Sequence, residues 1–390
     1  MIFCTFALEC LKRKMMTPIQ MVDLEQQYLR LKPEIDAAIQ RVLDSTAFIQ
    51  GSPVRDFEEQ LAHYTGSKYV ISCGSGTDAL LAALMALGVG AGDEVITVPF
   101  TFIATVEVIS LLGAKPVFVD VCEENFNMDV RQLDAAITPK TKAIIPVHLY
   151  GQCANMEPIL KVANKHNISV IEDACQSLGS VYTFSDGTKK QAGTIGTIGC
   201  TSFFPSKNLG GYGDGGALMT DDDALAERLR AICRHGSKER YHHQYVGLNS
   251  RLDTLQAAIL QVKLRHLDDF IVARQKAATY YQENLQNIKG LRLPEASSYS
   301  THTYHQYTLK VDSNSRDNLR KCLSDKQIPT AIYYPVPAHL QSAYQYLNYR
   351  EGDFPVSERL CKEVISLPMH TEMTTEQLQF ITQTIVNCPL

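Results

Sequence analysis

No apolar run in this 390-residue sequence reaches the roughly 20 residues that a membrane-spanning helix needs. The chain also lacks a Lys/Arg-rich segment, and its formal net charge of −5 gives no reason to expect nucleic acid as a partner. Apolar residues make up 45% of the chain and charged residues 20%, as is ordinary for soluble globular proteins. The composition therefore predicts a globular protein without a membrane or nucleic-acid partner.

The 11 cysteines include no CxxC pair and no Cys/His spacing suited to zinc, so no metal site is expected. Single cysteines beside apolar residues, such as Cys73, Cys200 and Cys233, indicate reduced, buried thiols rather than a disulfide framework. This pattern predicts a cytoplasmic location.

Residues 1–15 are expected to be an extra leader. Residues 3–11 are mildly apolar and the basic residues 12–14 follow them, whereas an export signal places its basic residues first. The true translation start would then be Met15 or Met16.

Short apolar runs alternate with helix-length segments between residues 69 and 220. The candidate strands are residues 69–73, 94–98, 116–121, 143–149, 169–173, 200–204 and 217–220. Helices are expected between them at 77–87, 101–112 and 156–166, and before them at 32–43, with Pro33 in the first turn, and from Ser52 to a stop at Gly66. This alternation predicts an α/β fold with a mainly parallel, seven-stranded sheet covered on both faces.

The pattern becomes helix-rich after about residue 255. We expect a long helix over 253–285, strands at 307–311 and 330–334, and a last helix that begins at Thr374 with a capping box to Gln377. These segments predict a smaller α+β domain over residues 256–390, next to a large domain over residues 16–255.

Polar clusters follow several of the predicted strands, where ligands bind in open α/β sheets. After residues 69–73, the small residues Gly74, Gly76 and Thr77 open a helix whose N-terminus suits a phosphate. The same residues match a dinucleotide fingerprint ending at Ala79, and a plain tight turn is an equally good interpretation of this segment alone.

Asp173 ends an apolar strand, where a carboxylate needs a partner such as a protonated pyridine nitrogen; a helix-capping role is the alternative. Lys207 lies between a strand end and a Gly-rich loop, where confinement would lower its amine pKa and make it a nucleophile and base. Ser202 could donate to a phosphate, and Phe102 could stack on a cofactor ring or pack in the core. Arg251 suits a carboxylate or phosphate, or an ion pair at a helix start.

The order of these clusters resembles that of the DegT/DnrJ/EryC1/StrS sugar aminotransferases. The motifs that carry the resemblance are Gly76-Thr77-Asp78-Ala79-Leu80, Gly92-Asp93-Glu94-Val95, Glu172-Asp173-Ala174, Ser202-Phe203-Phe204-Pro205-Ser206-Lys207 and Gly213-Asp214-Gly215-Gly216. The resemblance runs from about residue 18 to the C-terminus. It implies the fold-type-I, aspartate-aminotransferase-like architecture, pyridoxal 5′-phosphate (PLP) as cofactor and a homodimer with active sites at the subunit interface.

The family roles carry over by matched position. Lys207 would form the Schiff base with PLP, Asp173 would pair with the pyridine nitrogen, Gln176 would lie near the ring hydroxyl and Phe102 would stack on the ring. The phosphate would be held by Gly76, Thr77 and Ser202, joined by Asn249 of the second subunit.

The segments 235–260 and 366–370 further resemble bacterial UDP-2-acetamido-2-deoxy-3-oxo-glucuronate aminotransferases of O-antigen synthesis, which use L-glutamate as donor. In those enzymes the residue matching Arg251 reaches the substrate carboxylate, with help from a His-Tyr pair that is Tyr333-Tyr334 here. A neutral dTDP-linked 3-keto-6-deoxyhexose is the rival substrate. A nicotinamide dehydrogenase and a non-catalytic regulatory module are the alternatives from other classes.

Overall fold

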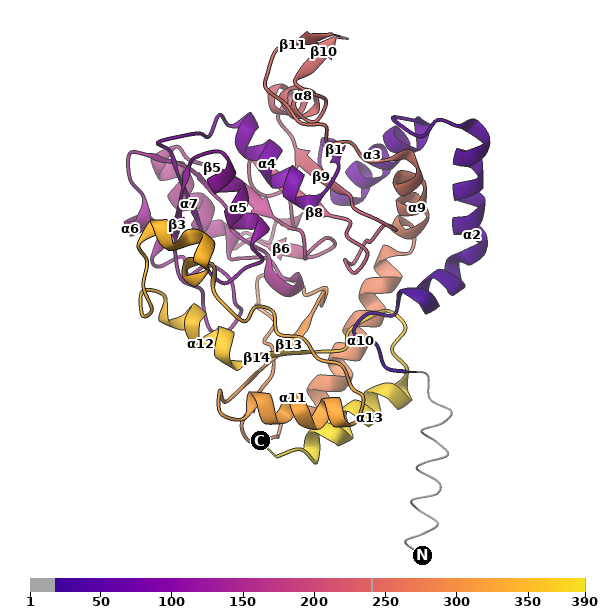
Figure 1. Cartoon of the computed structure of the whole chain (residues 1–390), viewed down its shortest axis with the longest axis vertical. Coiled ribbons are helices and arrows are strands. Elements are labelled where there is room, and N and C mark those ends of the chain that lie inside the picture. Colours follow the sequence, from indigo (N-terminus) through magenta and orange to yellow (C-terminus); the bar gives the residue numbers. More distant parts are fainter. Residues whose placement is uncertain (1–17, 240, 390) are drawn as a thin grey trace, which may run out of the picture.

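The computed structural model describes residues 18–239 and 241–389, so the predicted leader lies outside the described residues. Its largest element is a seven-stranded sheet in the order β1-β9-β8-β5-β4-β2-β3 (Figure 1). The strands are β1 (Tyr69–Cys73), β2 (Glu94–Thr97), β3 (Lys115–Phe118), β4 (Thr141–Ile144), β5 (Ser169–Asp173), β8 (Ile198–Ser202) and β9 (Gly216–Thr220). Only β9 runs antiparallel to its neighbours within this sheet. Six strands point the same way, which confirms the predicted fold class.

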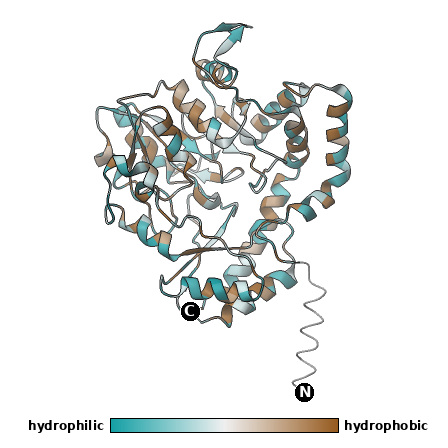
Figure 2. Ribbon diagram, in the orientation of Figure 1, coloured by the Kyte–Doolittle hydropathy of each residue, from teal (hydrophilic) through white to brown (hydrophobic). Residues whose placement is uncertain are grey.

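Helices cover both faces of this sheet. They are α3 (Ser52–Thr65), α4 (Gly76–Ala86), α5 (Ala104–Leu111), α6 (Leu133–Ala136), α7 (Met156–His166) and α8 (Asp223–Ile232), with the 3-10 turn η1 (Leu149–Gly151). Val95 and Ile171 belong to one buried cluster, and their chain neighbours Ile96 and Val170 belong to another. Because successive strand residues point to opposite faces, both faces are buried. Figure 2 accordingly shows hydrophobic residues concentrated on the central strands.

Helix α2 (Leu24–Ser45) begins before the predicted start, and Pro33 lies inside it rather than in its first turn. Proline removes one backbone donor, but a stripe of buried residues at helical spacing holds the helix together: Leu31, Ile35, Ala38 and Val42. Helix α3 ends at Gly66 as predicted, in a left-handed conformation with φ 77°.

The helix predicted over 253–285 is two helices, α9 (Thr254–Leu264) and α10 (Leu267–Leu285). His266 between them leaves the helical conformation, with φ −106° and ψ 5°. Asp268 and Asp269 then lie in the first turn of α10, where acidic side chains stabilise a helix N-terminus. The periodicity is continuous across the break, which explains why the sequence did not reveal it.

A second, antiparallel sheet is formed by β12 (Leu291–Arg292), β13 (Tyr307–Val311) and β14 (Val364–Leu367), below the main sheet in Figure 1. One buried cluster joins it to α10, α11 (Arg316–Asp325) and α13 (Thr375–Val386). The predicted capping box of Thr374 and Gln377 is present. The domain boundary between residues 255 and 256 stays a prediction.

The predicted strand at 330–334 is wrong, because only Ala331 pairs in a bridge, with Ser366 of β14. The segment after it instead forms short turns that pack against the main sheet. The remaining elements are β6 (Val181–Thr183), β7 (Lys189–Gln191), β10 (Ser237–Glu239), β11 (His242–His243), η2 (Ala338–Leu340), η3 (Ser342–Leu347) and α12 (Pro355–Glu363).

The expectation of reduced cysteines is only partly right. Cys73, Cys200 and Cys233 are free and buried as predicted, but Cys322 and Cys388 form a disulfide. The two residues are 66 positions apart, and the packing of α11 against α13 brings them together. No local spacing in the sequence could have indicated that pairing.

Among residues 18–239 and 241–389, no helix combines the length and apolar character needed to cross a membrane. The same residues contain no group of three or more His, Cys, Asp or Glu side chains arranged to hold a metal ion.

Arg274 ties α10 to the segment that enters β13. Its Nη1 donates to the backbone oxygens of Met369 (2.9 Å), Tyr304 (3.2 Å) and His305 (3.4 Å), and burial lowers its pKa to about 10. We expect Arg274→Met to lower the free energy of unfolding by about 2–4 kcal/mol, because buried carbonyls lose their donor. Lys276→Met, at an exposed position of the same helix, should change it by less than about 0.5 kcal/mol. Urea unfolding compares the two, and equal stabilities would contradict the role given to Arg274.

Candidate active site

Four polar loops meet at one edge of the main sheet, because the strands before them point the same way. The loops are residues 74–77 after β1, 98–103 after β2, 174–176 after β5 and 203–207 after β8. A Cβ atom placed on Gly76 would lie 2.7 Å from Cβ of Ser202 and 2.9 Å from Sγ of Cys175. Three loops that were predicted separately therefore touch at this point.

Lys207 lies in the turn that follows β8, where its backbone N–H donates to the carbonyl oxygen of Phe204 at 2.8 Å. Burial lowers the pKa of its amine, although Cys175 and Asp173 act in the opposite direction. An amine with a lowered pKa is uncharged more often near neutral pH, so it is a better nucleophile and base than a solvated lysine. The environment predicted for Lys207 from the sequence is therefore the one found.

Asp173, at the end of β5, is 6% exposed and held on both carboxylate oxygens. Oδ2 accepts from Oγ1 of Thr105 at 2.7 Å, and Oδ1 accepts from the backbone N–H of Cys175 at 3.2 Å. Because Thr105 donates its only hydroxyl proton to the carboxylate, Thr101 donates to Thr105 over 3.1 Å. This relay fixes the carboxylate in one orientation beside Lys207.

Aromatic side chains line the side of the site that faces the C-terminal half of the chain. Phe102 is 53% exposed, and its ring centroid lies 6.0 Å from that of Tyr334. Gln176 donates from Nε2 to the hydroxyl of Tyr334 at 3.0 Å and accepts the backbone N–H of Tyr150 at 2.8 Å. The hydroxyl of Tyr150 in turn donates to the backbone oxygen of Tyr333. Predicted cofactor and substrate residues are thus in direct contact.

Among the described residues, no hydrogen bond or ion pair joins Asn249 or Arg251 to Lys207. Ser250 between them contacts the loop after β1, where its Oγ accepts the backbone N–H of Gly74 at 2.9 Å. The side chain of Asn249 is exposed and its backbone pairs with Arg234. Burial lowers the pKa of Arg234, and the nearby charge of Arg251 lowers it further. Within the described residues, Arg251 forms no ion pair with Asp253, so the helix-start interpretation is not supported.

A hydrogen-bonded network beneath Asp173 was not predicted from the sequence. Glu172 and His148 are fully buried, and their side chains are joined by a hydrogen bond of 2.8 Å between Nε2 and Oε2. Nδ1 of His148 accepts the backbone N–H of Ala154, so its proton is on Nε2. Three loop N–H groups also donate to the carboxylate of Glu172: those of Gly193 (2.9 Å), Ile195 (2.6 Å) and Gly196 (2.6 Å). Glu172 thereby anchors the strand end that carries Asp173.

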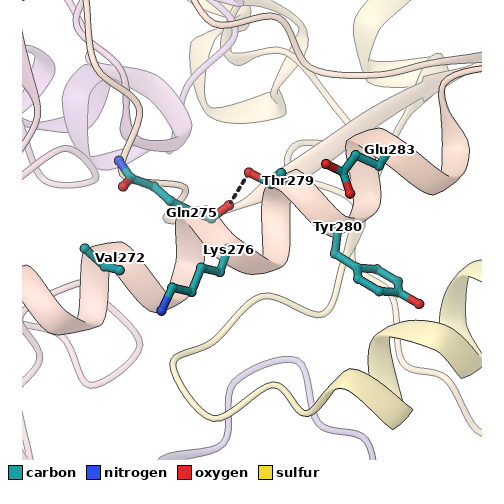
Figure 3. A pocket seen from close by; sticks show the side chains of 6 residues that line it. All are labelled: Val272, Gln275, Lys276, Thr279, Tyr280 and Glu283. Atoms are coloured by element: carbon teal, nitrogen blue, oxygen red, sulfur yellow. Dashed lines mark hydrogen bonds between the residues drawn. The ribbon is translucent and has the colours of Figure 1, made fainter.

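Two surface hollows lie elsewhere. One, of about 320 Å³, runs along the outer face of α10, where six side chains stand in a row (Figure 3): Val272, Gln275, Lys276, Thr279, Tyr280 and Glu283. The other, of about 460 Å³, lies beside the β6–β7 hairpin. Neither is lined by a predicted site residue, so the chemistry of the sheet edge, not the size of a hollow, identifies the candidate site.

The sequence pattern of the DegT/DnrJ/EryC1/StrS aminotransferase family matches residues 30–386. A UDP-2-acetamido-2-deoxy-3-oxo-D-glucuronate aminotransferase from Pseudomonas aeruginosa is 47% identical, over 95% of this chain and 100% of that protein. A pleiotropic regulatory protein from Geobacillus stearothermophilus is also 47% identical, over 94% of this chain and 97% of that protein. A dTDP-3-amino-3,6-dideoxy-alpha-D-galactopyranose transaminase from Aneurinibacillus thermoaerophilus is 40% identical, over 94% and 98%.

Solved structures agree with these relatives. DesV from S. venezuelae, in complex with a ketimine intermediate, has a TM-score of 0.91 and 38% identity over 95% of this chain and 98% of that one. NtdA from Bacillus subtilis, solved with the bound cofactor PMP, has a TM-score of 0.83 and 33% identity over 90% and 80%. This chain therefore belongs to the DegT/DnrJ/EryC1/StrS aminotransferase family, whose members are PLP-dependent enzymes that transfer amino groups.

Proposed function

We propose that this chain transfers the amino group of L-glutamate to the keto group of a nucleotide-linked sugar, with PLP held on Lys207. The preferred substrate is UDP-2-acetamido-2-deoxy-3-oxo-glucuronate, the sugar named for the 47% identical P. aeruginosa relative. The observation that carries the proposal is a lysine amine with a lowered pKa beside the fixed carboxylate of Asp173. With PLP bound, Lys207 would act as the base and Asp173 would supply the anion that pairs with the ring nitrogen.

The phosphate of PLP fits the N-terminus of α4. Backbone N–H groups at a helix N-terminus favour a phosphate, and Gly76 lies so close to Ser202 that a Cβ there would close the space. Gly76, Thr77 and Ser202 are therefore proposed to hold the phosphate. Asn249, exposed in one chain, is proposed to complete that site in a second subunit.

The ring of PLP would lie between Phe102 and Asp173. The half-exposed face of Phe102 would stack on the ring. Asp173 would pair with the ring nitrogen, and the amide of Gln176, already oriented by Tyr150 and Tyr334, would lie near the ring hydroxyl. Every polar group of the cofactor then meets a fixed partner.

When bound, PLP supplies a ring that withdraws electrons from the carbon that loses its proton. The Nζ atom of Lys207 takes that proton from the α-carbon of glutamate. In the second half of the cycle the same atom delivers a proton to the sugar carbon that receives the amino group, so one base serves both halves. Asp173, oriented by Thr105, holds negative charge at the far edge of the ring.

We further propose a cytoplasmic homodimer that supplies amino-sugars for polysaccharides such as the O-antigen of lipopolysaccharide. The exposed apolar side chains of Phe48, Ile49 and Val246 and the projecting β10–β11 hairpin in Figure 1 support a second subunit. In that dimer Arg251 would reach the substrate carboxylate in the neighbouring site, near Tyr333 and Tyr334.

The rival substrate is a dTDP-linked 3-keto-6-deoxyhexose. The 40% identical dTDP-sugar transaminase supports it, as does Tyr333 in place of the histidine of the uronate enzymes. A purely regulatory role has the name of the G. stearothermophilus relative in its favour. The intact arrangement of Lys207 and Asp173 favours catalysis instead, and it has no role in a nicotinamide dehydrogenase. Conversion of glutamate to 2-oxoglutarate by the PLP-loaded protein, without added nicotinamide nucleotide, distinguishes an aminotransferase from a regulatory protein and from a dehydrogenase.

Replacing Lys207 by alanine is expected to abolish the covalent link to PLP and to slow the glutamate half-reaction by about 1000-fold or more, because the base is lost. Single-turnover absorbance measures the rate, and borohydride reduction followed by peptide mapping locates the adduct in the wild type. A variant with near-normal turnover, or an adduct on another lysine, would refute the role given to Lys207.

Thr105→Val should slow the glutamate half-reaction by about 10- to 100-fold, because a hydrogen bond to a buried charge is lost without a change of shape. The cause is a freer Asp173 carboxylate, so the pH titration of the PLP absorption band should shift as well. Thr105→Ser keeps the hydroxyl and serves as the matched control. Equal rates for the valine and serine variants would contradict this account.

Arg251→Leu is expected to slow amination of the UDP-keto-uronate by about 100-fold, because the substrate carboxylate loses a charged donor. The rate with a neutral dTDP-3-keto-6-deoxyhexose should stay within about threefold. A screen of both sugars with glutamate as donor measures the two rates. If both fall equally, Arg251 does not read the carboxylate; if the neutral sugar is the better wild-type substrate, the uronate assignment is wrong.

A further inference from the structure

A second buried lysine, Lys263 on α9, reaches the loop that carries Lys207. Lys263 is 1% exposed, and burial alone lowers its pKa to about 7. Its Nζ donates to the carbonyl oxygen of Gly210 at 2.8 Å and lies 4.7 Å from the ring centroid of Tyr212. Burying an amine costs free energy unless hydrogen bonds compensate for the lost water. The contact with Gly210 is therefore expected to have a structural role.

The same face of α9 also holds the next residues of the loop. Gln256 lies two helical turns before Lys263, and its Oε1 accepts the backbone N–H of Tyr212 at 2.8 Å. A Cβ placed on Gly211 would lie 2.7 Å from that oxygen, so a larger residue there would displace the Gln256 side chain from its present position. Two side chains of α9 therefore hydrogen-bond two loop residues, Gly210 and Tyr212, on either side of Gly211.

Gly210 and Gly211 also contact the segment on the other side of Lys207 in the same loop. The backbone N–H of Gly211 donates to the carbonyl oxygen of Phe203 at 2.8 Å, on the other side of Lys207 in the sequence. A Cβ on Gly210 would lie 2.3 Å from the carbonyl oxygen of Pro205, so the two arms of the loop are in contact. A shift of Gly210 would therefore displace the turn from which Lys207 projects.

We propose that Lys263 is a positioning residue: by holding the carbonyl of Gly210, it sets the direction in which the amine of Lys207 points. The inference rests on the proposed function of Lys207. The role is mechanical, because the contacts of Lys263 are with the carbonyl oxygen of Gly210 and the ring of Tyr212.

Lys310 on β13 provides a matched control. It is also a buried lysine that donates to a backbone oxygen, that of Glu123 at 2.8 Å, and it lies 5.6 Å from the ring centroid of Phe126. Its contacts, which include an ion pair of 3.9 Å with the carboxylate of Glu123, involve no residue of the loop 203–212. Lys310→Met therefore reproduces the loss of a buried amine without touching that loop.

The test compares Lys263→Met, Lys263→Arg and Lys310→Met as PLP-loaded full-length proteins. Hydrogen–deuterium exchange of the peptide covering residues 204–216 reports the loop directly, and the pH titration of the visible PLP band reports the Lys207 linkage. For Lys263→Met we expect about tenfold faster exchange in that peptide and a titration midpoint shifted by at least about half a pH unit. We also expect about tenfold lower kcat in the glutamate half-reaction, with KM within about twofold.

Lys263→Arg should restore the midpoint in part, because a donor is kept, and Lys310→Met should lower thermal stability without moving the midpoint. An unchanged midpoint and loop exchange in Lys263→Met would overturn the inference while leaving the proposed function intact. Absence of the PLP band in the wild type would instead overturn the proposed function. Should Lys263→Met not fold, Lys263→Gln replaces it in the test, because its side chain is too short to make the 2.8 Å contact with the carbonyl oxygen of Gly210. An unchanged midpoint and unchanged loop exchange in that variant would then overturn the inference.

Discussion

The need to compensate buried charge at one edge of a parallel sheet governs the rest of this structure. Strand β5 ends with two consecutive carboxylates that point to opposite faces. Glu172 is satisfied by His148 and by backbone donors of the next loop, so it holds the strand end in place. Asp173 is left to face the site, where Thr105 orients it and Lys207 lies nearby. Glu172 therefore stabilises the fold, and Asp173 remains available for the chemistry of the site.

The sequence predicted those parts of the fold that depend on local patterns. Short apolar runs at regular spacing located all seven strands of the main sheet, because strands buried on both faces are apolar throughout. The errors concern features that depend on packing. The break at His266 and the proline inside α2 do not interrupt the hydrophobic periodicity, and the disulfide between Cys322 and Cys388 joins residues 66 positions apart. Only the packed tertiary structure decides those points.

The same division applies to the candidate site. Asp173 and Ser202 are the last residues of parallel strands and Lys207 follows one of them, so their convergence could be predicted from the direction of those strands. Thr105 had a weaker signal, since it lies one turn after Thr101 in the helix predicted at 101–112, and the two hydroxyls are in fact hydrogen-bonded. Lys263 had none, because nothing in its surroundings along the chain distinguishes it from an exposed lysine. Asn249 was recognised only through resemblance, whereas Arg251 also stood out as a donor suited to a carboxylate or phosphate.

The residues proposed to bind the cofactor and those proposed to bind the substrate lie in different segments of the chain, which would allow relatives to differ in the sugar that they use. The cofactor edge is built from strand ends whose backbone is fixed by the sheet and by α9, so its geometry tolerates little change. The proposed substrate residues lie on segments outside the sheet, around Arg251 and Tyr333. Such segments can change without disturbing Asp173, except through Tyr334, which hydrogen-bonds Gln176. A substitution of Tyr334 would disturb Gln176, which is proposed to lie near the cofactor ring. Relatives that use another sugar are therefore expected to differ at Tyr333 more often than at Tyr334.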